Sequence, residues 1–264
     1  MSIFESYRDY AEVLFLKGLW SFVFLCALAY NLYVKVFGYR PGSAPTVESH
    51  NAHELSSWLQ NKYNLTALVY DFCDMPWERI YRNLRPQFVG DLKGDCLELG
   101  VGTGRNIRFY GNKANLTGID ISSVMIRQAR ARSTLPEVSC EVKALLVADA
   151  TSLKEIPDNS FDNVSASFLF CVLPNELQQP ALSEIHRVLK PGGRFRIIEL
   201  TYSNDPVKRW YQDTFAPFVE FMYGAKFDRH TLTAIEKMDG MVLAKKEYLN
   251  NADVMLLLEG TKKK

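Results

Sequence analysis

The chain has 264 residues, 47% of them apolar, and its 31 basic and 30 acidic residues leave a formal net charge of +1. This length and composition allow a full buried core and suggest one main domain with an appendage. The nearly balanced charge creates no field that would attract an acidic polymer, so we expect no nucleic-acid partner.

The five cysteines are scattered and odd in number, and none forms the close pair that metal sites and redox motifs use. We interpret them as reduced thiols in an intracellular compartment, and we predict no metal site.

The first predicted element is an apolar segment over residues 18–34, which has no formal charge and is bracketed by Lys17 and Lys35. At about 1.5 Å per residue it covers about 26 Å. If the segment extends over 13–37 and both lysine side chains reach outward, its length matches a bilayer core of about 30 Å. We therefore predict residues 1–37 as a membrane anchor with one transmembrane helix, followed by a polar linker at 38–49.

Two alternatives exist for this segment: a core or interfacial helix of the following domain, and a cleaved signal peptide. Acidic residues precede the apolar run at positions 5, 9 and 12, unlike the basic leader of a signal peptide. Basic residues balance across the segment, so charge does not determine its orientation.

Residues 50–264 form the predicted main domain, which begins with a helix at 52–63. From Asp95 onward, short apolar runs alternate with helical stretches. The runs are 96–99, 116–119, 145–148, 161–170 and 195–200, and the helical stretches are 122–133 and 177–189. This alternation predicts an α/β fold with a mostly parallel sheet and helices on both faces. The segments 241–248 and 253–259 flank Asn250-Asn251 and predict a C-terminal antiparallel hairpin, which brings the sheet to seven strands.

A glycine-rich turn follows the first apolar strand. After Glu98, glycine occupies every second position at Gly100, Gly102 and Gly104. A backbone without Cβ atoms can pass close to a ligand, and a helix expected to follow would offer free N–H donors. A dinucleotide fingerprint would need small residues where this chain has Arg105 and Ile107.

Acidic residues end the next two strands. Asp120 lies twenty residues after Gly100, where a carboxylate can accept hydrogen bonds from both hydroxyls of a ribose. Asp149 ends the third strand and is placed to meet an adenine amino group. We expect Ile121 and Ala150, which follow these acids, to complete a nucleoside site.

These motifs resemble those of class I S-adenosylmethionine (SAM) dependent methyltransferases, over roughly residues 70–264. Phe161-Asp162-Asn163-Val164 and the Pro-Gly-Gly turn at 191–193 add to the resemblance. It implies a Rossmann-like fold with SAM as cofactor. The glycine turn would contact the amino-acid part of SAM, Asp120 the ribose and Asp149 the adenine, while Tyr70 would close over the methionine end.

Within this class the chain is most similar to the ubiquinone and menaquinone C-methyltransferases and the related phospholipid N-methyltransferases. The residues concerned are Tyr70-Asp71, the segment 186–193 and Ile198-Glu199-Leu200. The apolar leader is also similar to that of membrane-anchored thiol methyltransferases. Because SAM is made in the cytosol, we expect the domain to face the cytosol or the mitochondrial matrix.

The acceptor pocket is predicted from two apolar segments. Phe168 and Cys171 follow the fourth strand, where amine-methylating families often carry a polar motif, and an aromatic insertion contains Trp210, Tyr211 and Phe215. The insertion is either a helix packed on the sheet or a lid over a hydrophobic acceptor.

His230, beside Asp228 and Arg229, is the candidate general base; the alternative is an ordinary surface histidine. We therefore predict a membrane-anchored, SAM-dependent methyltransferase acting on a lipophilic quinol-type molecule or phospholipid head group. The alternatives are a thiol or other small-molecule methyltransferase and a non-catalytic assembly factor.

Overall fold

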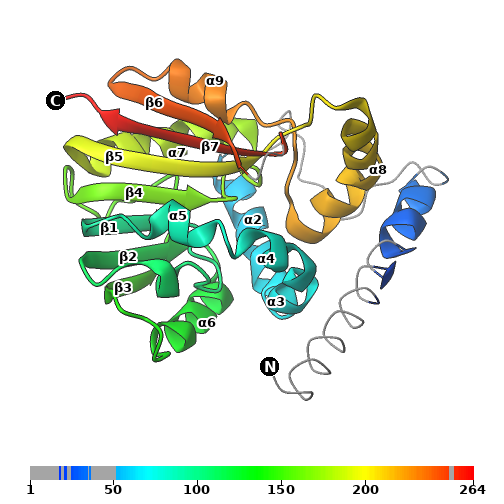
Figure 1. Cartoon of the computed structure of the whole chain (residues 1–264), viewed down its shortest axis with the longest axis horizontal. Coiled ribbons are helices and arrows are strands. Elements are labelled where there is room, and N and C mark those ends of the chain that lie inside the picture. Colours follow the sequence, from blue (N-terminus) through cyan, green and yellow to red (C-terminus); the bar gives the residue numbers. More distant parts are fainter. Residues whose placement is uncertain (1–17, 19–20, 23–24, 35, 37–51, 250–252) are drawn as a thin grey trace, which may run out of the picture.

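A computed structural model describes residues 18, 21–22, 25–34, 36, 52–249 and 253–264. Within these residues, seven strands form one sheet in the order β3-β2-β1-β4-β5-β7-β6 (Figure 1). Their bounds are β1 Gly94–Leu99, β2 Ala114–Asp120, β3 Glu141–Val147, β4 Phe161–Ser167, β5 Leu189–Leu200, β6 Met241–Tyr248 and β7 Met255–Lys262. Strands β1 to β5 are parallel, and β7 runs antiparallel to both neighbours. The predicted mostly parallel sheet with a terminal hairpin is confirmed.

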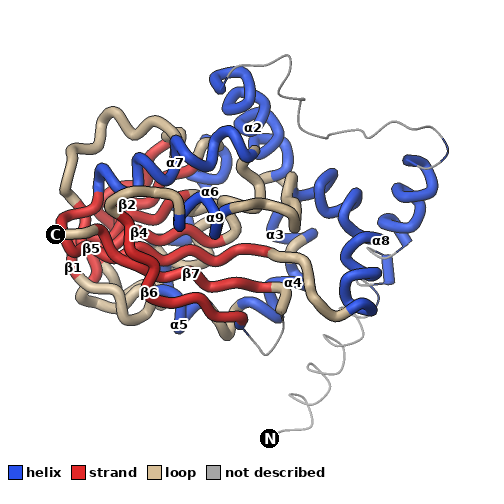
Figure 2. The backbone as a smooth tube through the Cα atoms, turned by 90° about the horizontal axis from the view of Figure 1, so that it is seen from above, coloured by secondary structure: helices blue, strands red, loops and turns tan. Residues whose placement is uncertain are grey.

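Helices cover both faces of the sheet, and Figure 2 shows α7 and α5 on opposite sides. The helices are α2 Ala52–Thr66, α3 Tyr70–Cys73, α4 Met75–Tyr81, α5 Arg85–Val89, α6 Ser123–Ser133, α7 Asn175–Val188, α8 Pro206–Tyr223 and α9 Thr231–Glu236. One core lies between the sheet and α2, α7 and α9, and a second contains residues of α5 and α6. The central strands β1 and β4 are therefore mostly buried, whereas the edge strand β3 exposes Leu146 and Val147.

Local signals determine where two helices that line the cavity begin, and where one of them ends. The Ser122 hydroxyl accepts the amide of Met125 at 3.2 Å and caps α6. The Asp205 carboxylate accepts the amides of Val207 and Lys208 and caps α8, which ends at the left-handed Gly224.

One local prediction is wrong. The glycine turn after β1 is followed by a three-residue 3-10 helix, η2 Ile107–Phe109, and no α-helix begins there. The turn therefore has no long helix behind it to supply free N–H donors. Instead, three short helices that the sequence did not predict, α3, α4 and α5, lie before β1. Figure 1 shows α3, α4 and α8 beyond the carboxyl ends of the parallel strands.

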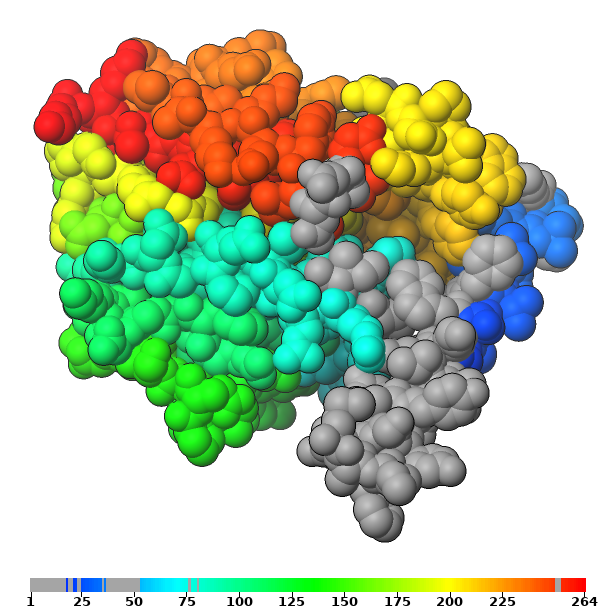
Figure 3. All heavy atoms as spheres, in the orientation of Figure 1, coloured from blue at the N-terminus to red at the C-terminus, as the bar shows by residue number. Residues whose placement is uncertain are grey.

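Residues 25–34 are helical and pack against α8. Tyr30 stacks on Phe221 with ring centroids 4.9 Å apart, the Asn31 amide donates to the Thr214 carbonyl, and Ala27 is buried. Figure 3 shows this contact at the end of the molecule opposite the C-terminus. Among the described residues, no helix is long and apolar enough to cross a membrane. The predicted span lies partly outside the described residues, and the predicted linker lies wholly outside them.

Candidate active site

A cavity of about 370 Å³ lies at the carboxyl end of the sheet. Its floor is formed by the segments that follow the parallel strands: 100–106 after β1, 119–121 at the end of β2, 148–150 after β3 and 167–173 after β4. Side chains from α2, α3, α4 and α8 close its other sides. This is the edge at which open α/β sheets bind ligands.

The glycine turn leaves open space on the cavity side. Gly100 and Gly102 line the cavity and adopt φ angles of 65° and 55°, which a side chain would strain. A Cβ atom added at Gly102 would meet nothing closer than the Gly100 carbonyl oxygen at 4.0 Å, so it would fill cavity space. The turn therefore forms a cradle that only a glycine backbone keeps open.

Two predicted members of the turn do not line the cavity. A Cβ atom at Gly104 would come within 2.8 Å of Ile107 and 3.0 Å of Ala129, so this glycine allows close internal packing. Glu98 is buried, and its Oε1 accepts the Asn106 side-chain amide at 2.6 Å. Burial raises the pKa of Glu98 to about 7. Gly104 and Glu98 therefore lie on the side of the turn away from the cavity. A ligand in the cavity would contact the other side of the turn.

The two strand-end acids both line the cavity, together with Ile121 and Ala150. Asp120 Oδ2 accepts the amide of Gly102 at 3.0 Å, and Oδ1 accepts the amide of Ser122 at 2.8 Å. Burial raises the pKa of Asp120 to about 6, and the two amides act against that shift. The carboxylate thereby fixes the glycine turn to the end of β2, in the position expected for a ribose contact. These residues fit the nucleoside and methionine parts of SAM.

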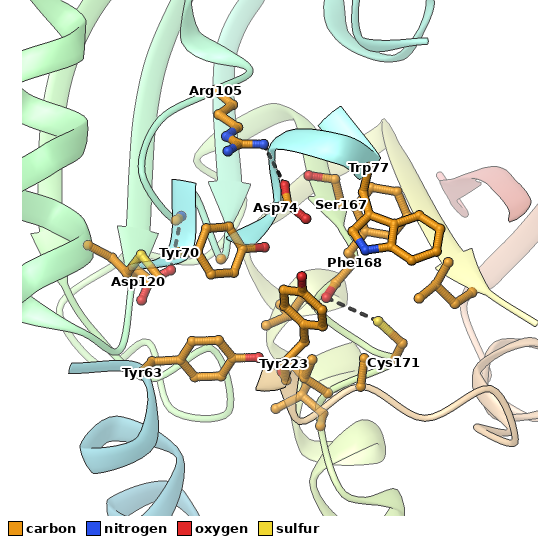
Figure 4. A pocket seen from close by; sticks show the side chains of 18 of the residues that line it. Tyr63, Tyr70, Asp74, Trp77, Arg105, Asp120, Ser167, Phe168, Cys171 and Tyr223 are labelled. Carbon is orange, nitrogen blue, oxygen red and sulfur yellow. Dashed lines mark hydrogen bonds and ion pairs between the residues drawn. The ribbon is translucent and has the colours of Figure 1, made fainter. Parts of the chain in front are cut away.

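Aromatic side chains dominate the other half of the cavity (Figure 4). They are Tyr63, Tyr70, Trp77, Tyr81, Phe168, Tyr211, Phe215, Tyr223 and Phe227. The cavity thus joins a polar donor half to an apolar acceptor half. Such a largely apolar, shaped site suits methyl transfer, which needs chiefly alignment of the reacting atoms.

The predicted acceptor residues separate into two groups. Phe168, Cys171, Tyr211 and Phe215 line the cavity, and so does Tyr70. Trp210 does not line the cavity, and 61% of the residue is exposed. His230 is also outside the cavity, exposed at the N-terminal end of α9, so the geometry gives it no contact with an acceptor.

An ion-pair network above the glycine turn was not predicted. Arg105 contacts Asp71, Asp74 and Glu78, and its Nη1 lies 2.8 Å from Glu78 Oε2. Arg85 also pairs with Glu78, and Arg132 of α6 pairs with Asp71 at 2.7 Å. Three arginines thus balance three acids and fasten α3 and α4 to the turn. The acids at 71, 74 and 78 follow one another at spacings of three and four, a helical signal that could have revealed this face.

Hydrogen bonds between distant segments close the acceptor half. The Tyr63 hydroxyl of α2 donates to the Tyr223 carbonyl at 2.6 Å, and the Tyr223 hydroxyl donates to the Cys73 carbonyl at 3.0 Å. Burial raises the pKa of Tyr63 well above its ordinary value, so its hydroxyl remains a donor at neutral pH. These contacts join α2, α3 and α8 into one roof.

Comparisons with known proteins agree with this geometry. Residues 97–197 match the family described as a methyltransferase domain. The chain is 37% identical over 131 residues to a phosphatidylethanolamine N-methyltransferase of Cereibacter sphaeroides. That match covers 49% of this chain and 62% of the relative, less than two thirds of its length. A ubiquinone/menaquinone biosynthesis C-methyltransferase of Burkholderia orbicola is 31% identical over 201 residues, which cover 68% of this chain and 77% of the relative.

Solved structures show the same fold at low identity. An O-methyltransferase family protein of Burkholderia thailandensis is 10% identical with a TM-score of 0.59, over 81% of this chain and 61% of that one. The cyclase SpnF gives a TM-score of 0.59 at 18% identity, over 84% of this chain and 97% of that one. Because a cyclase shares the fold, the fold alone does not show the reaction. The sequence relatives and the glycine cradle together indicate methyl transfer from SAM. The chain belongs to the class I SAM-dependent methyltransferases.

Proposed function

We propose that this enzyme transfers the methyl group of SAM to a lipophilic small molecule, with a quinol-type ring or a phospholipid head group as acceptor. The observation that carries the proposal is the aromatic and apolar wall of the acceptor half of the cavity. The names of two relatives support it, since one is a phospholipid N-methyltransferase and the other a quinone-biosynthesis C-methyltransferase.

We further propose that residues 1–37 hold the enzyme on a membrane as a single-pass anchor, with the domain toward the cytosol or the mitochondrial matrix. In the described part of this segment, one side packs on α8. Leu25, Leu32 and Val36 are exposed to 63%, 63% and 64%, which leaves an apolar side available to lipid.

The test is transfer of a labelled methyl group from SAM by the full chain into a membrane lipid extract. We expect label in the organic phase, and parallel reactions with phosphatidylethanolamine vesicles and with a demethylated quinol identify the acceptor class. Label found only in water-soluble products would contradict a lipophilic acceptor and favour a thiol or other small molecule. SAM binding without transfer to any acceptor would indicate a non-catalytic protein.

A further inference from the structure

Methylation of a hydroxyl or an amine requires a group that takes the proton lost by the methylated atom. The acceptor atom forms a bond to the methyl carbon, the sulfur–carbon bond of the sulfonium breaks with its electron pair left on sulfur, and the acceptor loses one proton. We propose that the Asp74 carboxylate takes this proton and later passes it to solvent. This inference rests on the proposed function and deepens it, because it assigns a proton acceptor to the same cavity.

Few groups around the cavity can accept a proton. Its described lining contains no histidine and no lysine; its acids are Asp74, Asp120 and Asp149. Asp120 is held by two backbone amides at the end of β2, and Asp149 Oδ1 accepts the amide and hydroxyl of Thr151. Both lie at the nucleoside end. Asp74 is the acid on the aromatic side.

The geometry of Asp74 leaves one oxygen available. The residue lies just before α4 and is 8% exposed. Its Oδ2 pairs with Arg105, whereas no hydrogen bond within the described residues reaches Oδ1. Figure 4 shows the carboxylate on the cavity side of α4, above the rings of Tyr70 and Tyr223. An acceptor held among these rings would therefore meet a carboxylate oxygen that has no competing donor.

The charged neighbours of Asp74 come from every element around it. They are Arg105 of the glycine turn, Arg85 of α5, Asp71 of α3 and Glu78 of α4, with Tyr70, Cys73, Tyr81 and Tyr223 as titratable groups nearby. Burial raises the pKa of Asp74 to about 7, and Arg105 opposes that rise. A proton acceptor with a pKa near the working pH is the most effective kind.

The other groups of the aromatic half are poorer proton acceptors. Burial raises the pKa of the Cys171 thiol well above its ordinary value, so the thiol stays protonated near neutrality. Asp71 and Glu78 do not line the cavity and are occupied by Arg132 and Arg85. Asp71 therefore provides a matched control: it shares Arg105 with Asp74 but does not face the cavity.

The kinetic test compares full-length Asp74→Asn, Asp74→Glu and Asp71→Asn in transfer to the acceptor identified above. We expect Asp74→Asn to lower kcat by about 100-fold or more and to remove the rise of the rate through pH 7, because general base catalysis contributes factors of about 10² to 10⁴. Asp74→Glu should restore part of the rate, and Asp71→Asn should keep the pH dependence. Equal losses in Asp74→Asn and Asp71→Asn, with the pH dependence kept in both, would overturn the proposal.

Two measurements do not depend on turnover. SAM affinity measured by calorimetry should be nearly unchanged in Asp74→Asn; a loss of about tenfold or more would assign the carboxylate to the donor and overturn the proposal. The folded pKa of Asp74 is about 7, above its ordinary value of 3.8, so stability falls as the pH rises from about 4 to about 7 and levels off above that. Asp74→Asn should therefore gain stability relative to the wild type across that range, and a constant difference would refute titration of Asp74 there.

The two proposals fail in different ways. Absence of methyl transfer by the wild-type chain to any lipophilic acceptor removes the proposed function and this inference with it. Transfer that persists in Asp74→Asn with an unchanged pH profile removes the inference alone.

Discussion

The two halves of the cavity are built in different ways. The donor half consists of turns that directly follow β1, β2 and β3, so its residues are placed by the strands that precede them. The acceptor half combines the segment after β4 with side chains from α2, α3 and α4, which precede the sheet, and from α8, which follows β5. These segments are far apart in the chain and meet only through tertiary packing. A local pattern can therefore identify the donor, whereas the acceptor depends on how distant helices are oriented.

The largest effect should come from filling the glycine cradle. We expect Gly102→Val to lower SAM affinity by about 100-fold or more, about 3 kcal/mol, because its side chain enters the cavity at a φ of 55°. The control is Gly192→Val, at a φ of 76° where the nearest atom to a Cβ is Lys264 Cε at 3.6 Å. Both variants carry the backbone strain, but only one occupies the site. Calorimetry with SAM distinguishes them, and equal losses would show that the cradle does not hold SAM.

The next effect should come from the ribose acid. Asp120→Ala should weaken SAM binding by about 1.5 to 3 kcal/mol, the range for lost charge-assisted hydrogen bonds. In the wild type, SAM affinity should fall as the pH drops through about 6, because protonation removes the charge of the Asp120 carboxylate. Asp95→Ala, at the amino end of β1, is the control and should leave affinity unchanged. Unchanged affinity in Asp120→Ala would mean that the ribose lies elsewhere.

The donor half could be predicted because strand, turn and acid are adjacent in sequence. A buried parallel strand appears as an apolar run, and its carboxyl end determines where the next residues lie. Gly100, Gly102, Asp120 and Asp149 all line the cavity for this reason. The antiparallel pairing of β6 and β7 was likewise predicted from a local turn signal between two segments.

The acceptor half could be predicted only in part. An aromatic run indicated α8, but the run alone does not show which side of the helix faces inward, and Trp210 faces out. His230 was chosen for its charged neighbours in sequence, which say nothing about distance to the cavity. Arg105 was noted for the motif that it breaks, whereas its three acidic partners lie 27 to 34 residues earlier in the chain. Contacts across such separations are a property of the packed fold.

A smaller effect should separate the two sides of α8. Phe215→Ala removes a ring that lines the cavity, and we expect it to raise KM for a lipophilic acceptor about tenfold, the effect of about 1.4 kcal/mol of lost apolar contact. Trp210→Ala removes a ring of greater size that is 61% exposed and should change KM little. Neither change should alter SAM affinity. A larger KM effect from Trp210→Ala would place the acceptor on the outer side of α8.

The smallest effect concerns Glu199, which supports the cavity wall from behind. Its Oε1 accepts the Phe170 amide at 3.1 Å, and its buried Oε2 has no partner among the described residues. Burial raises the pKa of Glu199 well above its ordinary value, although the Phe170 amide and Arg229 act against it. A raised folded pKa means that stability is lost as the pH rises through it, so Glu199→Gln should gain about 1 kcal/mol over the wild type toward alkaline pH.

Glu259 provides the opposite case. Its carboxylate pairs with Arg194 at 2.7 Å and Arg196 at 2.8 Å, and its pKa is lowered: burial would raise it, but the two arginines outweigh that effect. Its charge therefore adds stability above the ordinary carboxyl pKa, so Glu259→Gln should lose stability at neutral pH and approach the wild type in acid. Denaturant unfolding of both variants between about pH 3 and 8 measures the contrast. If both variants were less stable than the wild type at neutral pH, Glu199 would be a paired charge like Glu259. The packing behind Phe170 would then be stabilised by that charge.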